Sequence, residues 1–268
     1  MAGGERQVRA WLGAVWWRPH AVGIAVAAIV LFVVTVQVIT YGLVTVFDAP
    51  VHAYFDAHQP RGVAQWAAVT AARLGQRGVT IPLLAVAGGW ASLRWRDPRP
   101  VVATVTGLAA LASLGTLLKV YVGRTPPVLD VDTVNAGVGN ITAWLASTLT
   151  VGAPPFEGFV SYPSGHTANA ALTFPLLAWL LFGASGVRPD AVALRRALLG
   201  SILPVVLVGT LMVVLDYHWV SEVLGGMALG AIVALTGRLV LGPGRAPAAA
   251  GERRLVVRSP VRAPRESG

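Results

Sequence analysis

The sequence contains no cysteine and little charge. Without cysteine, the chain can form neither a disulfide nor a thiolate metal site, and it has no cysteine nucleophile. Charged residues make up 12% of the 268 residues, whereas soluble domains carry roughly 25%. Hydrophobic residues make up 55% of the chain and fall in long runs, which is typical of a polytopic membrane protein.

Lysine is almost absent as well. Lys119 is the single lysine, and all other basic side chains are arginines. In a background so biased toward arginine, a lone lysine is a candidate for a chemical role. The net charge of +9 lies in short clusters between the apolar runs. We therefore interpret it as a signal of topology and lipid contact, and we expect no nucleic-acid partner.

The apolar runs predict an all-α fold, a polytopic membrane helical bundle of six transmembrane helices with an interfacial helix and a long outer loop. The expected spans are residues 21–47, 79–93, 101–122, 167–182, 197–215 and 219–241. Residues 51–78 are only moderately apolar and predict one helix along the membrane surface, in which His52 and His58 would be solvated. Residues 123–163 form the long loop.

The chain divides into three segments. Residues 1–20 are basic and aromatic, which predicts a cytoplasmic interfacial segment and not a cleaved signal. Residues 21–242 are the six-helix domain, and residues 243–268 are a basic tail expected to be disordered near anionic lipid. Arginine clusters gather on the side of the two termini, so the positive-inside rule predicts that both termini are cytoplasmic.

A short motif, Pro163-Ser164-Gly165-His166, stands between the polar loop and an apolar helix. Pro163 and Gly165 suit a tight turn, and Ser164 is a natural N-cap. A helix N-terminus offers free backbone N–H groups and a partial positive charge, so it can bind an anion. His166 adds a group that exchanges a proton near neutral pH. A cap followed by an interfacial histidine would give the same motif, so its meaning depends on the other segments.

Two other segments fall at the same membrane depth in the predicted topology. One holds Lys119 and Arg124, and the other holds His218 and Glu222. Because His218 and Glu222 are spaced i, i+4, they share a helix face. The carboxylate can then accept the N–H of one ring nitrogen and leave the other nitrogen free to attack or to take a proton. Asp216, just before them, is interpreted as a helix-start residue.

Together the segments predict a phosphate site with cationic donors, a helix N-terminus and two histidines at the outer face. Each part has a simpler alternative. Lys119 could be a snorkelling anchor, Arg124 an ordinary loop charge, and Glu222 a purely structural partner of its histidine. Ionisable groups inside a membrane are functional by default, and the three segments share one face, which favours the phosphate site.

The three segments resemble the motifs of the type-2 phosphatidic acid phosphatase superfamily of integral membrane lipid phosphatases, which also contains vanadium haloperoxidases. The family pattern is Lys-x6-Arg-Pro, then Pro-Ser-Gly-His, then Ser-Arg-x5-His-x3-Asp. Residues 163–166 match the middle motif completely. Lys119 and Pro127 match the first motif, and His218 matches the third. The resemblance covers about residues 100–235.

The chain departs from the family pattern at both arginines. Pro126 occupies the arginine position of the first motif, and Leu211-Met212 occupies the Ser-Arg position of the third. Glu222 stands in place of the family's aspartate. An arginine binds phosphate through two parallel hydrogen bonds, which no apolar side chain replaces. Arg124, two residues before Pro126, is the expected substitute.

The resemblance implies a reaction through a phosphohistidine. His218 would attack phosphorus, His166 would protonate the leaving oxygen, and Glu222 would orient His218. Lys119, Ser164 and the Gly165 backbone would hold the phosphate. No metal and no other cofactor is implied.

The implied substrate is a lipid phosphate held in the bilayer of a bacterial plasma membrane. A polyprenyl phosphate or pyrophosphate carrier of cell-envelope synthesis is favoured, and a glycerophospholipid phosphate comes next. One alternative is a transferase, in which an alcohol on a second lipid or glycan intercepts the phosphohistidine. Another is a non-catalytic lipid-binding protein, which the missing family arginines would suit. The sequence gives no indication of oligomeric state.

Overall fold

The computed structural model describes residues 17–152, 154–183 and 191–242, and these are almost entirely helical. The expectations for residues 1–16, for the basic loop at Arg188 and for the tail after Gly242 lie outside the described residues. The helices are α2 (Arg18–Ile39), α3 (Asp48–Ala57), α4 (Val63–Ala72), α5 (Arg77–Trp95), α6 (Arg99–Val122), α7 (Val138–Leu149), α8 (Gly165–Phe182), α9 (Ala191–Val214) and α10 (Val220–Leu241). Three short 3-10 helices join them: η1 (Leu43–Phe47), η2 (Arg73–Gly75) and η3 (Pro127–Leu129).

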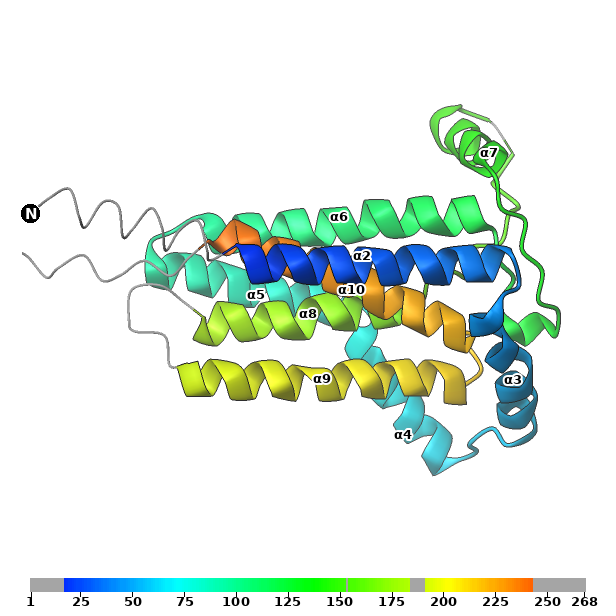
Figure 1. Ribbon diagram of the computed structural model, residues 1–268, viewed down its shortest axis with the longest axis horizontal. Helices are drawn as coiled ribbons and strands as arrows, with labels where there is room; N and C mark the ends of the chain where they lie inside the picture. Colours follow the sequence, from blue (N-terminus) through cyan, green and yellow to red (C-terminus); the bar gives the residue numbers. More distant parts are fainter. Residues whose placement is uncertain (1–16, 153, 184–190, 243–268) are drawn as a thin grey trace, which may run out of the picture.

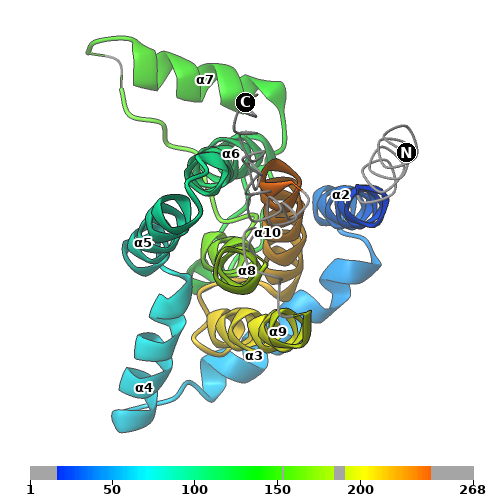
Figure 2. The same ribbon diagram turned by 90° about the vertical axis from the view of Figure 1, so that its left-hand side faces the viewer.

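The longest helices of the described residues, α2, α5, α6, α8, α9 and α10, run side by side (Figure 1). Seen along the bundle, α8 is the central helix, and α2 packs on the outer side of α10 (Figure 2). By length and composition, α2, α6, α10 and residues 192–214 of α9 could each cross a membrane. The shorter helices α5 and α8 lie within the same bundle. The expected all-α polytopic membrane fold is therefore confirmed.

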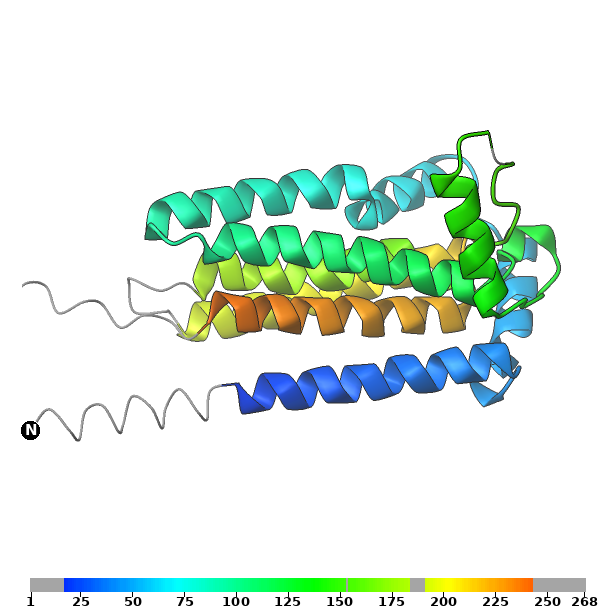
Figure 3. The same cartoon turned by 90° about the horizontal axis from the view of Figure 1, so that it is seen from above.

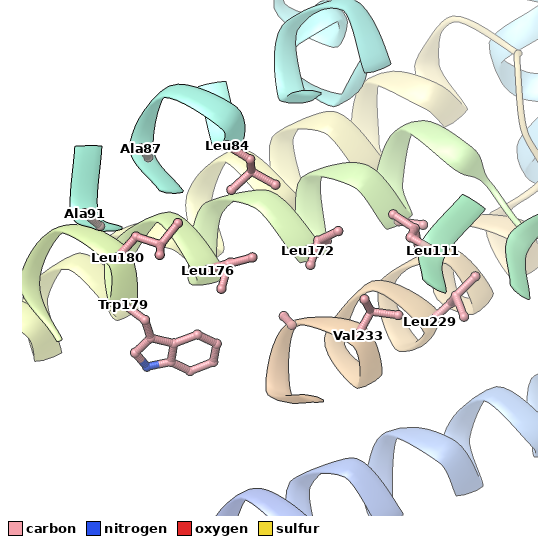
Figure 4. Close-up of a cluster of buried hydrophobic side chains, with 12 residues drawn as sticks. Leu84, Ala87, Ala91, Leu111, Leu172, Leu176, Trp179, Leu180, Leu229 and Val233 are labelled. Carbon is pink, nitrogen blue, oxygen red and sulfur yellow. The ribbon is translucent and has the colours of Figure 1, made fainter. Parts of the chain in front are cut away.

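The bundle has an apolar exterior and an apolar core. Phe32, Val86 and Leu203, on three different helices, are 69%, 72% and 72% exposed, as suits side chains that face lipid. Inside, leucines of the central helix such as Leu172 and Leu176 pack against side chains of α5, α6 and α10 (Figure 4). This core holds the central helix in place, and the first turn of that helix carries Gly165 and His166 of the Pro-Ser-Gly-His motif.

Two glycines bring α10 against the backbone of α8. A Cβ atom on Gly226 would lie 2.5 Å from the carbonyl oxygen of Ser164, and one on Gly230 would collide with the carbonyl of Ala168. Small residues at such positions let membrane helices approach closely. The starts of α8 and α10 are consequently held side by side.

All segments predicted to carry chemistry lie at one end of the bundle. At this end α6 and α9 finish, α8 and α10 begin, and the short helices α3 and α7 gather (Figures 1 and 3). The opposite end carries the arginines at the start of α2, the end of α5 and the start of α6. The connecting segments therefore lie at alternate ends of the bundle, as the sequence predicted.

Four details differ from the expectation. The fifth span begins at Ala191 and not at residue 197. The first span ends at Ile39 and not at Phe47, because Tyr41 adopts a left-handed backbone (φ 52°) and a 3-10 helix follows. Residues 51–78 are not one surface helix: they contain most of α3, all of α4 and η2, and the start of α5. The long loop contains α7, which runs across the bundle axis (Figure 2).

Candidate active site

His218 and Glu222 form a close polar pair at this end of the bundle. Nδ1 of His218 lies 2.6 Å from Oε2 of Glu222, whose side chain is fully buried. His218 sits in the turn before α10, and its backbone N–H donates to the carbonyl of Met212 at 3.1 Å. With Nδ1 donating to the carboxylate, Nε2 is the nitrogen left with a free electron pair. The pairing expected from the i, i+4 spacing is present.

Ser161 supports this pair from the loop before α8. Its hydroxyl donates to the same Glu222 oxygen at 2.7 Å and lies 3.5 Å from Nδ1 of His218. The other carboxylate oxygen, Oε1, is buried and has no hydrogen-bond partner among the described residues. Ser161 was not among the residues predicted from the sequence, where its signal was its position two residues before Pro163.

The first turn of α8 places His166 next to these groups. The side chain of Ser164 accepts the Thr167 N–H at 3.5 Å, which confirms the N-cap. The Ser164 N–H donates to the backbone carbonyl of Glu222 at 3.0 Å and so joins the start of α8 to α10. His166 lies close enough to both His218 and Lys119 to interact with them electrostatically. Three segments that are distant in the sequence therefore meet here.

Lys119 reaches this site from the last turn of α6. Its ammonium group donates to the carbonyl oxygens of Val160 at 2.8 Å and Ser161 at 2.9 Å. Its Cε atom lies 4.0 Å from the place where a Cβ atom on Gly165 would stand. An ammonium has three N–H donors, so one donor remains for a ligand beside the start of α8.

A cavity of about 110 Å³ opens beside Lys119, far above the roughly 10–15 Å³ that one water needs. Its polar wall contains Arg77, Lys119, Ser164, Gly165 and Asn169. Its apolar wall comes from α5, α6, α8 and α10 and includes Ile81, Leu108, Leu111 and Leu229. Neither histidine lines it, although His166 directly follows the wall residue Gly165. The cavity joins a polar head region to an apolar interior.

Arg124 does not take the place expected for it. Its guanidinium is fully buried and donates to Asp132 from Nε at 2.8 Å and from Nη2 at 2.7 Å. Nη2 also donates to Asp48 at 2.8 Å, and Nη1 donates to Ser221 at 2.6 Å. Four N–H···O contacts use most of the five donors of an arginine. This geometry does not support a role for Arg124 in binding phosphate.

The charge of Arg124 is fixed by the same contacts. Burial alone would lower the pKa of this guanidinium, but its hydrogen bonds to Asp132 and Asp48 and the charge of Glu222 raise it above the ordinary value. Two carboxylates surround one guanidinium, so the cluster repels a further anion. Arg124 instead ties the long loop to the starts of α3 and α10.

His52 and Asp216 also depart from expectation. His52 is not a solvated surface residue: Nδ1 lies 2.8 Å from Asp216, Nε2 lies 3.3 Å from Asp130, and the side chain is 14% exposed. Asp216 is not a helix-start residue, because α10 begins at Val220 and the backbone of Asp216 is left-handed (φ 57°). Together these contacts join α3 to the turn that carries His218.

Tyr162, next to the motif, is excluded as an acid–base group. Burial raises its pKa to about 12, against the lowering effect of its hydrogen bond with Thr35. The phenol is therefore protonated at neutral pH and has a structural role between α2 and the loop. Among the residues that the structure describes, no three or more His, Asp or Glu side chains converge as a group that could hold a metal ion.

The fold and the site define a class: a membrane-embedded helical bundle with two histidines, a lysine and a helix N-terminus gathered at one end. A family model described as the PAP2 superfamily matches residues 100–242. The chain belongs to this superfamily, and the resemblance seen in its motifs is confirmed. The matched region contains every site residue named from the sequence.

The chain is similar to one bacterial phosphatase in sequence and to one solved structure in fold. Phosphatidylglycerophosphatase B of Bacillus subtilis (strain 168) is 36% identical over 77 residues, which are 29% of this chain and 37% of that protein. The similarity thus spans well under half of the relative. The crystal structure of a transmembrane PAP2 type phosphatidylglycerolphosphate phosphatase from Bacillus subtilis has a TM-score of 0.58 and 18% identity, covering 78% of this chain and 92% of that one. The similarity to this crystal structure is a similarity of fold alone.

Proposed function

We propose that the protein is a lipid phosphatase of the plasma membrane that works through a phosphohistidine on His218. The observation that supports this most is the 2.6 Å contact between Nδ1 of His218 and the buried Glu222. A carboxylate in that position fixes the imidazole tautomer and stabilises the positive charge that develops during attack. It also leaves Nε2 as the nucleophile.

The reaction proceeds in two steps. The electron pair of His218 Nε2 attacks phosphorus, the bond from phosphorus to the lipid oxygen breaks, and that oxygen takes a proton from His166. Water then attacks the phosphohistidine while His166 accepts its proton, which releases phosphate and restores both rings. Lys119 and the backbone N–H groups at the start of α8 stabilise the negative charge on the phosphoryl oxygens.

The cavity supports a lipid substrate. Its polar wall, with Lys119 and Ser164, suits a phosphate, and its apolar wall between the helices suits an acyl or prenyl chain. The name of the partial Bacillus relative favours phosphatidylglycerol phosphate as the first substrate to test. Polyprenyl phosphate and diphosphate, the substrates expected first from the sequence, form the second arm of the same assay.

The test is phosphate release by the purified protein in mixed micelles with chelator present. Wild type is expected to release phosphate, and His218→Ala is expected to release none above background. Radiolabelled substrate should leave acid-labile, base-stable label on the wild-type protein. His58→Ala is the control, because His58 is exposed and distant in sequence from the motifs. Release by His218→Ala equal to wild type would disprove the assignment.

The orientation is part of the proposal: both termini in the cytoplasm and the site at the outer face. Because the chain has no cysteine, one introduced cysteine can be labelled alone. Glu157→Cys, at the site end, should react with an impermeant maleimide in intact cells, whereas Arg94→Cys, at the end of α5, should react only after lysis. The reverse pattern would overturn the orientation.

A further inference from the structure

The site lacks both guanidinium groups of the motif pattern. Pro126 stands at one arginine position, and Met212, at the other, is 1% exposed within an apolar cluster. Arg124, the nearest alternative in the sequence, is held by two carboxylates. Lys119 is then the only cation of the three motifs that faces the cavity, and two of its donors are used by carbonyl groups. A doubly charged phosphate is bound more strongly where an arginine adds two parallel hydrogen bonds.

Arg77 faces the same cavity from a different part of the chain. It is the first residue of α5, its side chain is exposed, and it shares the polar wall with Lys119 and Ser164. It lies close enough to Lys119 for the two positive charges to repel each other. No acidic side chain among the described residues forms an ion pair with it. The charge of Glu222 also acts on Lys119, but no ion pair joins a carboxylate to either cation among the described residues. Two like charges on one wall are stabilised when an anion lies between them.

The backbone next to Arg77 is fixed to the first turn of α8. A Cβ atom on Gly75 would collide with the carbonyl of His166, so η2 packs directly against this turn. The amide of Asn169 donates to the carbonyl of Gly75 at 3.0 Å. The carbonyl of Gln76 then accepts the Val79 and Thr80 N–H groups at 2.9 and 3.0 Å, which starts α5. The position of Arg77 is thus tied to that of the motif helix.

From this geometry we infer that Arg77 is the guanidinium that binds the substrate phosphate in this protein, in the role that the two missing arginines would otherwise fill. The inference rests on the proposed phosphatase function. The planar group of Arg77 donates two parallel hydrogen bonds to phosphoryl oxygens opposite Lys119. It belongs to the segment before the matched region, and for that reason the motifs did not reveal it.

The test compares Arg77→Ala and Arg77→Lys with Arg73→Ala. Arg73 is a matched control: it is exposed, lies four residues earlier in η2, and does not line the cavity. Loss of one charged donor to the transition state should lower kcat/KM of Arg77→Ala by about 10²–10³. Arg77→Lys should keep part of the activity, and Arg73→Ala should match wild type. Added methylguanidinium should restore part of the activity of Arg77→Ala only, which a purely structural role would not explain.

A second measurement separates this inference from the proposed function. Binding of orthovanadate, a mimic of the phosphoryl transition state, is followed by tryptophan fluorescence without any lipid. Arg77→Ala should bind it at least about tenfold more weakly than wild type, since a charge-assisted donor pair is lost. Equal vanadate binding and equal turnover in Arg77→Ala would overturn the inference and leave the phosphatase intact. Absence of turnover in wild type, with weaker vanadate binding in Arg77→Ala, would instead overturn the phosphatase and keep the anion site.

Discussion

Asp48 accepts hydrogen bonds from both the backbone N–H and the hydroxyl of Ser221, which lies 173 residues later in the chain. The hydrogen bond from the Ser221 N–H has an N···O distance of 2.9 Å, and Ser221 lies in the first turn of α10. A carboxylate at this place caps the helix and opposes the positive end of its dipole. Asp48 also binds Arg124, so one side chain of α3 fixes both the start of α10 and the long loop.

Replacing Asp48 with asparagine should destabilise the protein strongly. The substitution keeps the size of the side chain but leaves the buried Arg124 with one carboxylate and the first turn of α10 with a weaker acceptor. Breaking a buried ion pair costs about 3–5 kcal/mol. We expect a clearly lower thermal unfolding temperature in detergent and a parallel loss of phosphate release, because His218 and Glu222 border that turn.

The matched control for this prediction is Asp56→Asn. Asp56 is in the same helix, and it is exposed, so its substitution should leave the unfolding temperature close to that of wild type. If Asp48→Asn unfolds at the temperature of Asp56→Asn, the capping role of Asp48 is wrong.

Replacing Glu222 with glutamine should remove most of the activity without unfolding the protein. An amide can present its N–H to Nδ1 of His218 and favour the tautomer in which Nε2 carries the proton. By analogy with the same change in a Ser-His-Asp triad, kcat should fall by about 10²–10⁴ while KM changes little. The measurement is steady-state phosphate release, and Glu157→Gln, the same change at an exposed loop glutamate, should behave as wild type. Unchanged kcat in Glu222→Gln would show that the carboxylate does not orient the nucleophile.

The sequence predicted the parts of the site that depend on local patterns. The N-cap at Ser164 follows from the turn chemistry of residues 163–166, and the contact of His218 with Glu222 follows from their spacing. The helices α6, α8 and α10 begin and end within two residues of their expected bounds. Each of these features depends on residues a few positions apart, where hydrophobic periodicity and capping preferences act.

The parts that were missed depend on pairings between distant residues. Asp48 meets Ser221, Arg124 meets Asp48, and Gly75 meets the backbone of His166. None of these pairings leaves a periodic signal in the sequence. Arg124 was expected to bind the phosphate because it lies close in sequence to Lys119 and Pro127. Proximity in sequence does not show whether a carboxylate on another helix will form an ion pair with the guanidinium.

Glycine at position 226 should be essential for the geometry of the site. A Cβ atom there would lie 2.5 Å from the carbonyl oxygen of Ser164 and 3.2 Å from Cβ of Thr167, so Gly226→Ala forces α10 away from the start of α8. Overpacking of this kind costs about 1–3 kcal/mol, and it separates His218 from His166. We expect lower thermal stability together with lower kcat.

Gly200→Ala provides the control for this change. Position 200 is also within a long helix, and a Cβ atom there has no neighbour within 4 Å. Alanine should stabilise α9 there by about 0.5–1 kcal/mol and leave phosphate release unchanged. Equal behaviour of the two alanine variants, by unfolding temperature and by kcat, would mean that close packing of α8 and α10 does not set the site.

His52 should make the stability of the site end depend on pH. Burial lowers its pKa, but the hydrogen bonds and charges of Asp216 and Asp130 outweigh this, so the pKa is raised above the ordinary value of 6.5. The other groups facing this pair are the carboxylate of Asp56 and the ring of Trp219. A histidine whose pKa is raised on folding stabilises the folded state fully below its unfolded pKa, and this stabilisation is lost as pH rises through the folded pKa.

Because the pKa of His52 is raised, replacing this histidine should cost more stability at low pH than at high pH. At pH values below about 6.5, wild type should unfold at a higher temperature than His52→Gln. The difference between the two unfolding temperatures should shrink as pH rises past the raised pKa. His58→Gln is the control, because His58 is exposed and its Nδ1 contacts the backbone carbonyl of Tyr54 instead of a carboxylate. Unfolding temperatures are measured across pH 5 to 9 for the three proteins. A difference between wild type and His52→Gln that stays constant or grows over this range would rule out the ion pair as the link between α3 and the turn that carries His218.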